Sequence, residues 1–305
     1  MKKTFSIAIM LIMVSSSLFA WGYHTHRKLT AEAFRNMPEA FQTRFNSQKK
    51  SFLKGATDPD TMIKDFMNHI YYPDGSQTGG LYRIQDLFNR AVDLLGSGIS
   101  DEKTAYVMGL MSHYIADLNV PLHTAGSERD PDEGSYHSRY ESDINHNLRN
   151  FHFSFSGERQ ISSLEERVKE MTTDALKHYD EIGASYRAGT DLEPLMAMTE
   201  KQLNAAVQNI VDFWCAALRS ARFNLTPTGA TEANWNLKAD DKNESAKINI
   251  NSASSAELAD FFNISAAKAQ RIVDSRPYRT AYDLAKSGVF NPMFIKRNKE
   301  KIKVR

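Results

Sequence analysis

Apolar residues recur every three or four positions along most of this 305-residue chain, the spacing that places them on one face of an α-helix. The stretches with this pattern cover residues 27–45, 83–96, 101–118, 136–151, 162–182 and 194–223. Alternation of apolar and polar residues, which is typical of a strand, is found only in the short stretch FHFSFS at 151–156. The pattern therefore predicts an all-α, multi-helix fold.

Residues 1–20 have the composition of a secretory signal peptide. Two lysines precede an apolar run from Ile7 to Val14, and Ala20 provides a small residue at the cleavage site. The run is too short to cross a membrane as a helix. We therefore expect an exported protein, secreted or periplasmic, whose mature chain begins at Trp21. An uncleaved N-terminal anchor is the alternative.

The helical pattern fails after residue 225. Residues 226–246 contain Pro, Gly, Thr, Asn and charges of both signs without periodicity, which indicates a linker. Beyond it, residues 247–305 carry 12 Lys and Arg against 5 Asp and Glu, a net charge of +7, whereas residues 21–246 have a net charge of −8. This asymmetry predicts two domains, 21–225 and 247–305, with different partners.

The chain has a single cysteine, Cys215, so it has no internal disulfide. An exported domain without disulfides needs another source of rigidity, either its core or a bound metal. Cys215 lies in the apolar stretch VDFWCAAL, which favours a buried packing role.

Histidines and carboxylates are paired four residues apart at two places in the chain. His113 and Asp117 form one pair, and His137 and Glu141 form the other, so each pair lies on one helical face. Pro121 should end the helix that carries the first pair, and the turn could bring His123 back towards it. Each residue taken alone is more often structural, but the repeated pairing points to metal ligands.

Further residues with metal-binding side chains precede these pairs. They are His24, His26, Asp58, Asp60 and His69. Nitrogen and oxygen ligands without thiolates suit zinc. Several such sets could hold more than one ion, and neighbouring zinc ions suit displacement at phosphorus because they activate water and bind the attacking and leaving oxygens.

These residues resemble the bacterial zinc-dependent phospholipase C family of all-α enzymes. The family motif H-Y-x-x-D-x-x-x-P-x-H matches the stretch from His113 to His123, and the following F-H-S-K-Y-E is similar to YHSRYE at 136–141. The early H-F-Y-D-P-D is similar to HIYYPD, which begins at His69. The resemblance covers roughly residues 21–225 and includes a tryptophan at the start of the mature chain.

The resemblance implies three zinc ions. The implied ligands are Asp60, His69, His113 and Asp117 for the first; His123, His137 and Glu141 for the second; and His26, Asp117 and the amino and carbonyl groups of Trp21 for the third. It also implies that Asp60 positions or deprotonates the metal-activated water, with Asp58 as the competing residue. His26 is preferred over His24 because family members and related nucleases show W-x-x-x-x-H.

The implied reaction is hydrolysis of the glycerol-side phosphodiester bond of a phospholipid. Phe66 matches a position that helps to hold a quaternary ammonium headgroup, although plain core packing is the alternative. Thr61 stands where the family has an aromatic residue, so choline preference is not implied. Zinc nucleases of the same superfamily give the alternative function, but they usually end the motif with H-x-x-x-D and contain disulfides.

The basic C-terminal region resembles competence-type helix-hairpin-helix domains. The matching pieces are ININ at 248–251, S-x-x-E-L at 254–258 and AKAQRI at 267–272. Such domains bind the nucleic-acid backbone through hairpin glycines and nearby cations. The first hairpin has Asn-Ile-Ser at 263–265, and the second keeps Gly288 but has Phe290 in place of its other glycine. Nucleic acid or another polyanion, an anionic membrane surface, or a structural docking role are the open alternatives.

Overall fold

The computed structural model describes residues 21–223 and 248–304, apart from 263, 265, 291–294, 297, 298, 300 and 301. The chain divides into two compact units, Met1–Trp235 and Asn236–Arg305. The predicted signal peptide (1–20) and linker (226–246) lie outside the described residues.

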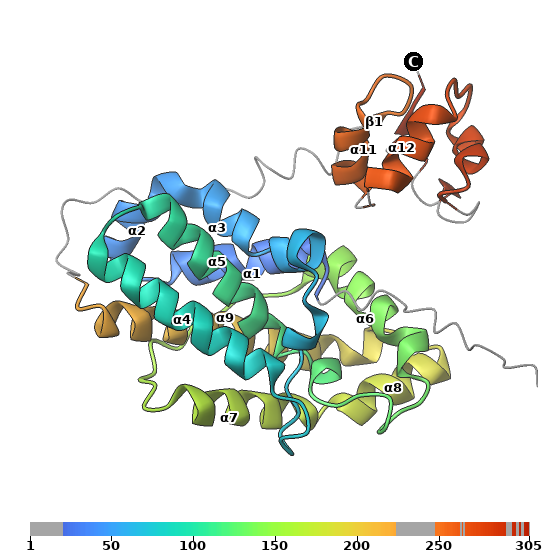
Figure 1. Ribbon diagram of the computed structural model, residues 1–305. Helices are drawn as coiled ribbons and strands as arrows, with labels where there is room; N and C mark the ends of the chain where they lie inside the picture. The colour runs from blue at the N-terminus through green and yellow to red at the C-terminus, as the bar shows by residue number, and fades with distance from the viewer. Residues whose placement is uncertain are drawn as a thin grey trace, which may run out of the picture. The chain divides into compact units, whose positions relative to one another are not determined.

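The first unit is built from helices, which confirms the all-α prediction (Figure 1). The α-helices are α1 (Tyr23–Arg35), α2 (Glu39–Phe45), α3 (Lys49–Gly55), α4 (Gly79–Ser97), α5 (Asp101–Asp117), α6 (Glu133–Asn147), α7 (Leu164–Leu176), α8 (Tyr179–Ala188) and α9 (Met196–Ser220). Short helical turns are η1 (Asn46–Gln48), η2 (Pro59–Ile63), η3 (Phe66–Asn68), η4 (Pro121–His123), η5 (Leu148–Asn150) and η6 (Glu193–Leu195). No described helix has both the length and the apolar character needed to cross a membrane.

Two stretches that the apolar spacing predicts as single helices, 27–45 and 162–182, are each divided into two helices in the structure. Pro38 separates α1 from α2, because its ring cannot continue the first helix and instead begins the next. The stretch 162–182 becomes α7 and α8, which are separated by Lys177 and His178. In both cases the apolar spacing continues across the break, so periodicity alone does not reveal it.

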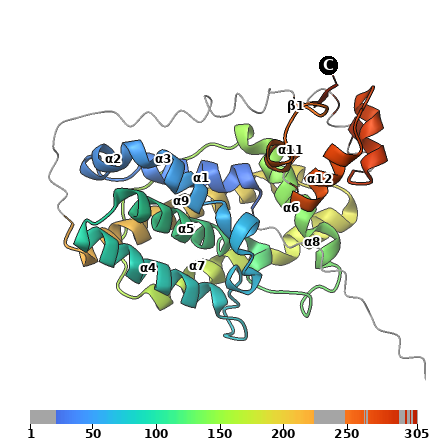
Figure 2. The same cartoon turned by 45° about the horizontal axis from the view of Figure 1, so that its top comes forward.

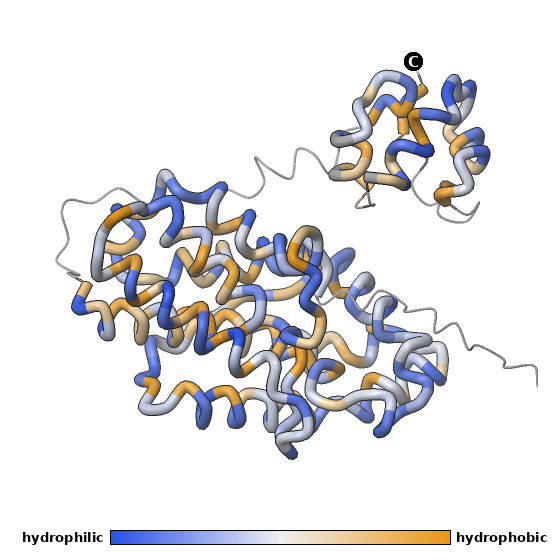
Figure 3. Tube along the Cα trace, in the orientation of Figure 1, coloured by the Kyte–Doolittle hydropathy of each residue, from blue (hydrophilic) through white to orange (hydrophobic). Residues whose placement is uncertain are grey.

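Helix α5 is the central element, in contact with α1, α3, α4 and α9 (Figures 1 and 2). Hydrophobic and hydrophilic residues alternate along the surrounding helices, as one-sided packing requires (Figure 3). Gly55 and Gly109 allow α3 and α5 to approach closely, because a Cβ at Gly109 would lie 2.2 Å from the Phe52 carbonyl oxygen. The core is fully buried and its rings lie edge to face or tilted, as with Phe52 and Trp214 at 5.2 Å.

Cys215 lies in this core and confirms the packing prediction. It is buried, and its sulfur lies 3.9 Å from the sulfur of Met37. Burial, followed by the charge of Asp212, raises the pKa of the thiol to about 12. The side chain is therefore a small apolar group at neutral pH.

The strand-like stretch FHFSFS (151–156) is not a strand. It forms an irregular extended segment whose backbone amides donate to side chains on one face of α9. The acceptors, spaced four residues apart, are Glu200 for His152 (2.8 Å), Asn204 for Ser154 (2.7 Å), Gln208 for Ser156 (3.3 Å) and Asp212 for Arg159 (2.8 Å). The alternating pattern thus reflects an extended chain bonded to a helix surface rather than to another strand.

The second unit has a small hydrophobic core of its own. Its elements are β1 (Ile248–Asn249), α11 (Ser255–Phe262), α12 (Ala266–Asp274), η8 (Ala281–Ser287) and β2 (Ile302–Lys303). The two strands pair in parallel, with Ile248 opposite Ile302. The buried side chains are Ile250, Ala253, Leu258, Ala269, Ile272, Tyr278, Leu284, Ile295 and Ile302.

Capping pairs, a serine or threonine followed three residues later by an acidic residue, begin α11 and η8. The Ser254 hydroxyl accepts from the Glu257 amide at 3.2 Å, and the Glu257 carboxylate accepts from the Ser254 amide at 2.7 Å. At η8, the Asp283 carboxylate accepts from the Thr280 amide at 3.0 Å. Asn291 and Pro292, a sequence typical of a helix start, and the hairpin residues Asn263 and Ser265 lie outside the described residues.

Candidate metal centre

The last turn of α5 presents His113 and Asp117 on one buried face, as their spacing predicts. The His113 Nε2 atom lies 3.1 Å from Asp117 Oδ2. Helix α5 ends at Asp117, and Pro121 starts η4, which carries the buried His123. The turn therefore returns His123 to the same region of the molecule, where its Nδ1 lies 2.8 Å from the His69 carbonyl oxygen.

The segment with η2 and η3 brings Asp60 and His69 to this face. His69 Nδ1 lies 2.8 Å from Asp117 Oδ2 and 3.6 Å from Asp60 Oδ1. Asp60 Oδ1 is also 3.6 Å from His113 Nε2. Asp60, His69 and His113 thus form one compact group of donors, all of them buried.

Helix α1 contributes His26 to a second group. Its ring stacks on the His113 ring with a centroid separation of 3.9 Å, and its Nε2 lies 3.3 Å from Asp117 Oδ1. The two carboxylate oxygens of Asp117 therefore point in different directions, Oδ1 to His26 and Oδ2 to His69 and His113. This is the arrangement expected of a carboxylate that bridges two cations.

A third group joins the end of η4 to helix α6. His137 Nε2 lies 3.0 Å from Glu141 Oε1, and His123 Nε2 lies 3.4 Å from the same oxygen. All three side chains are buried. The structure therefore joins the His137–Glu141 pair to His123, whereas His113 and Asp117 belong to the other two groups.

The donor chemistry of these groups fits zinc. Each group presents imidazole nitrogens and carboxylate oxygens within 4.8 Å of one another. Several of their buried polar atoms have no hydrogen-bond partner in the protein: both ring nitrogens of His26, both carboxylate oxygens of Asp117, Asp60 Oδ1, His69 Nε2 and Glu141 Oε2. Buried polar atoms are almost always satisfied, so this concentration of unsatisfied donors and acceptors indicates a cation-binding role.

Comparison with known proteins identifies the family. Residues 25–187, more than half of the chain, match the family described as zinc dependent phospholipase C. The chain belongs to the zinc-dependent phospholipase C family. The description of the family names zinc dependence and phospholipase C activity, so phospholipids are the family's substrate class. Residues 243–303 match a helix-hairpin-helix motif, a nucleic-acid-binding type of motif.

Solved structures give a more distant likeness. The one titled "Alpha Toxin from Clostridium Absonum" aligns with a TM-score of 0.45 and 17% identity, and covers 70% of this chain. The alignment spans 66% of that toxin's chain, just under two thirds of its length. A search of curated proteins finds no significant match.

Backbone carbonyls orient two histidines of the donor groups. The Nδ1 atom of His113 lies 2.9 Å from the Ala56 carbonyl oxygen. The Nδ1 atom of His123 likewise lies 2.8 Å from the His69 carbonyl oxygen. A carbonyl accepts the Nδ1 proton and so leaves the Nε2 lone pair of each ring facing the donor group.

A carboxylate that the sequence analysis missed orients a third histidine. Glu133, at the start of α6, lies with Oε1 2.8 Å from His137 Nδ1 and also accepts from the Tyr179 hydroxyl. It precedes His137 by four residues, so the sequence did contain a signal. The sequence pattern drew attention only to the downstream partner, Glu141.

Asp65 is a second missed neighbour, four residues before His69. Its Oδ1 lies 3.5 Å from His69 Nε2, which is too long for a good hydrogen bond. It accepts from the Tyr114 hydroxyl at 2.7 Å and pairs with Arg83. Asp65 therefore fixes the approach of the η2–η3 segment to α4 and α5.

The charges of the site favour a bound cation. Burial opposes a proton on His69, but the nearby carboxylates of Asp117 and Asp65 outweigh it and raise its pKa to about 10. Burial also opposes protonation of His137, whereas the charge of Glu141 and the hydrogen bond to Glu133 raise its pKa to about 10. At Asp117 burial would raise the pKa, but His113 and His26 hold it well below its usual range.

The competition between Asp58 and Asp60 is decided by their partners. Asp58 pairs with Lys54 and accepts from the Tyr106 hydroxyl at 2.8 Å, so both contacts turn it away from the histidines. Asp60 lies in the donor group. Of the two carboxylates, only Asp60 therefore lies beside the histidines, and its metal-binding role stays a prediction.

Three other residues considered in the sequence differ in their position relative to the donor groups: His24, Trp21 and Phe66. His24 is half-buried, packs edge-on against Tyr23 and lies outside the three donor groups. Trp21 is fully buried, and its indole nitrogen donates to the Ala116 carbonyl at 3.0 Å, next to Asp117. Phe66 is half-buried with its ring 5.9 Å from the His69 ring, so it borders the site rather than the core.

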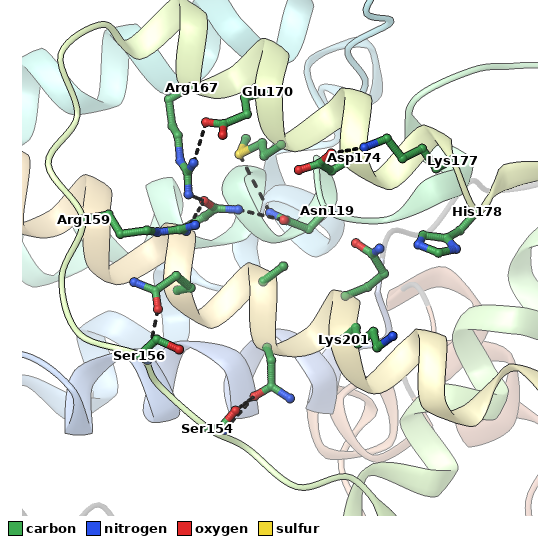
Figure 4. Close-up of a pocket in the computed structure, with 16 residues that line it drawn as sticks. Asn119, Ser154, Ser156, Arg159, Arg167, Glu170, Asp174, Lys177, His178 and Lys201 are labelled. Carbon is green, nitrogen blue, oxygen red and sulfur yellow. Dashed lines mark hydrogen bonds and ion pairs between the residues drawn. The ribbon is translucent and has the colours of Figure 1, made fainter.

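A polar pocket of about 450 Å³ lies elsewhere in the first unit, between α7, α9 and the extended segment (Figure 4). No residue of the three donor groups lines it. Its charged side chains pair with one another, as in Arg167 with Glu170 and Lys177 with Asp174. Arg159 and Arg167 also bind the buried Asp212. We infer that this network attaches α7 and the extended segment that begins with FHFSFS to α9.

Proposed function

We propose that this chain is an exported phospholipase C that hydrolyses the glycerol-side phosphodiester bond of phospholipids. The observation that carries the proposal is the division of Asp117 between two donor groups, with a third group beside them. Membership in the zinc-dependent phospholipase C family supports the substrate class. The leader-like residues 1–20 support export.

Three zinc ions would be held by nine residues. We assign Asp60, His69, His113 and Asp117 to the first; His123, His137 and Glu141 to the second; and His26, Asp117 and the backbone of Trp21 to the third. Bound zinc supplies Lewis acidity towards the phosphoryl oxygens and makes water acidic enough to act as a nucleophile near neutral pH.

Asp60 is the residue that we assign to the attacking water. Burial raises the pKa of its carboxyl group, against the effect of His113 and His26, and a higher pKa strengthens a general base. Its Oδ1 has no hydrogen-bond partner within the protein. It is therefore available to orient a water molecule and to accept its proton while the phosphodiester is attacked.

Phe66 is the residue that we assign to contact with the headgroup. Its half-buried ring lies at the border of the donor groups, 5.9 Å from the His69 ring. An aromatic face at this place attracts a cationic headgroup and also packs against uncharged ones. Phe66→Ala should therefore raise KM for choline lipids more than it lowers kcat.

The free amine of Trp21 would complete the third set. Its indole hydrogen bond to the carbonyl of Ala116, the residue next in sequence to Asp117, holds Trp21, which we assign as the start of the mature chain. Before cleavage the Trp21 nitrogen is an amide and a poor ligand, and removal of the leader makes it an amine. A mature chain with one extra residue before Trp21 should lose one zinc ion and much of its activity; full zinc content and unchanged turnover would refute this role.

A nuclease or nucleotidase of the same superfamily is the second candidate. The helix-hairpin-helix match in the basic C-terminal unit favours it, because such motifs hold nucleic acid. Zinc-replete mature protein should be incubated with phosphatidylcholine, other phospholipids and single-stranded nucleic acid, each with and without chelator. Chelator-sensitive release of diacylglycerol supports the phospholipase, whereas nucleic-acid cleavage without lipid cleavage supports the nuclease. No turnover on any substrate would contradict both.

A further inference from the structure

The chain between Asp60 and His69 carries an exposed apolar surface beside the metal centre. Met62 and Met67 are 72% and 60% exposed, and Ile63 is 37% exposed. Asp60 and His69, only two positions from this stretch at either end, are buried. We call this surface, with the exposed lysine inside it, the apolar rim: Met62, Ile63, Lys64 and Met67.

The backbone holds the apolar rim outward. Lys64 closes η2 in the left-handed conformation, with φ of 58°, and its amide donates to the Pro59 carbonyl at 2.7 Å. The next residue, Asp65, points inward to the Tyr114 hydroxyl at 2.7 Å. The exposure of the neighbouring apolar side chains therefore follows from fixed contacts.

The far end of the apolar rim is fixed as well. Gly79, the first residue of α4, packs so closely that a Cβ there would lie 2.1 Å from the Met67 carbonyl oxygen. Arg83 in the same helix pairs with Asp65. Tyr82, beside Arg83, is 65% exposed and extends the apolar character along the start of α4.

We propose that the apolar rim docks on the surface of a phospholipid bilayer or micelle and so delivers headgroups to the metal centre. This inference rests on the proposed function. Clustered exposed apolar side chains mark interaction sites, and methionine adapts well to a disordered partner. Lys64 adds a positive charge that favours anionic lipid headgroups. A lipid surface fits this position better than a protein, because it carries the substrate to the buried donors instead of covering them.

The test uses the zinc-loaded full chain with Met62→Gln and Met67→Gln combined. The matched control is Ile99→Gln, a residue 77% exposed beyond the other end of α4. Helix α4 separates this control from the apolar rim, and its 19 residues correspond to a length of about 28 Å at the rise of an α-helix. Turnover is measured on a short-chain phosphatidylcholine below its critical micelle concentration and on vesicles of long-chain phosphatidylcholine.

We expect the double variant to lose about tenfold or more of its turnover on vesicles. The reason is that two apolar side chains, which docking would bury in the lipid surface, are replaced by polar ones. Turnover on the monomeric lipid should stay within about twofold, since neither methionine belongs to a donor group. The Ile99 control should match the unaltered protein on both substrates. Equal losses on monomers and vesicles, or unchanged vesicle turnover, would overturn the proposal.

Binding without hydrolysis separates the apolar rim from the chemistry. Vesicles of a phosphonate analogue, whose scissile oxygen is replaced by carbon, should co-sediment with the protein and with the Ile99 control but not with the double variant. Lys64→Gln should weaken binding only when the vesicles contain anionic lipid. If the unaltered protein cleaves no phospholipid, the proposed function fails, and binding to these vesicles still tests the apolar rim. Dimers in size-exclusion chromatography that dissociate in the double variant would assign the surface to a second copy instead.

Discussion

Both units of this chain have an apolar core, but they differ in what they bury besides it. In the first unit five histidines and three carboxylates that line the donor groups are buried together. Many of their polar atoms have no hydrogen-bond partner within the protein. In the second unit the buried cluster is apolar, and its capping residues Ser254 and Glu257 satisfy each other at the surface.

This difference predicts how far the stability of each unit depends on a bound cation. An apolar core is favourable without any ligand. A buried set of imidazoles and carboxylates carries a desolvation cost that protein contacts offset only in part, so a cation must supply the remainder. The first unit is therefore expected to depend on metal, whereas the second is not.

Removal of metal should give the largest effect. A ligand present at about 1,000 times its Kd stabilises a protein by about 4 kcal/mol, and about 1 kcal/mol shifts Tm by about 2–4 °C in a unit of this size. Chelation should therefore lower the Tm of the first unit by about 10 °C or more and leave the transition of the second unit in place. Differential scanning calorimetry measures both transitions. Equal shifts in the two would contradict the claim that only the first unit depends on metal.

Asp60→Asn and Asp58→Asn form a matched pair of neighbouring carboxylates. We expect Asp60→Asn to lower kcat by about 10²–10⁴, because a general base is lost. Asp58→Asn removes only the contacts to Lys54 and Tyr106, so its kcat should stay within about fivefold. Steady-state kinetics on a soluble phospholipid distinguish them, and a greater loss in the Asp58 variant would reverse the assignment.

Glu133→Gln should weaken zinc binding by about 10–100-fold, the usual effect of removing a carboxylate that orients a metal-binding histidine. Glu133 contacts His137 and Tyr179 but is not itself a member of a donor group. Competition with a fluorescent zinc chelator gives the affinity. The control is Glu170→Gln, an exposed partner of Arg167, which should bind zinc normally; equal affinities in the two variants would leave Glu133 without an orienting role.

Zinc loading should release protons at neutral pH. The pKa values of His69 and His137 are raised to about 10, so both rings are protonated at pH 7 in the metal-free protein. Zinc requires neutral imidazole, so binding at pH 7 should release about two protons, and the release should vanish as the pH rises through 10. Calorimetric titrations in buffers of different ionisation enthalpy count these protons; binding without release would show that the rings are already neutral.

Ser254→Ala should give the smallest effect. It removes the hydroxyl that accepts from the Glu257 amide at the start of α11, and such a loss costs about 1 kcal/mol. The calorimetric transition of the second unit should therefore move down by a few degrees, while zinc content and the transition of the first unit stay unchanged. A shift of the first unit would show that the two units are not independent in stability.

Helices and the grouping of the buried histidines and carboxylates were predictable where side chains meet through local spacing. The pairs His113–Asp117 and His137–Glu141 lie on helical faces, so four-residue spacing was enough to group them. The same reasoning could have found Glu133. The choice of Asp60 over Asp58 could not follow from spacing, because it depends on Tyr106, which is distant in sequence.

The FHFSFS segment shows why the remaining features could not be predicted. Its alternation is that of a strand, but its hydrogen-bond acceptors are side chains on α9, about fifty residues later. No local pattern distinguishes a strand from an extended chain held by a helix. In the same way, the outward turn at Lys64 is a backbone conformation that the sequence does not indicate.

Zinc content tests the central claim most directly. Asp117 contributes to two of the three proposed ion sites, whereas His123, His137 and Glu141 form the remaining one without it. Elemental mass spectrometry of the mature protein should therefore find three zinc ions per chain, and Asp117→Asn should retain about one. An absence of tightly bound zinc in the unaltered protein, or three ions in the Asp117 variant, would contradict the account.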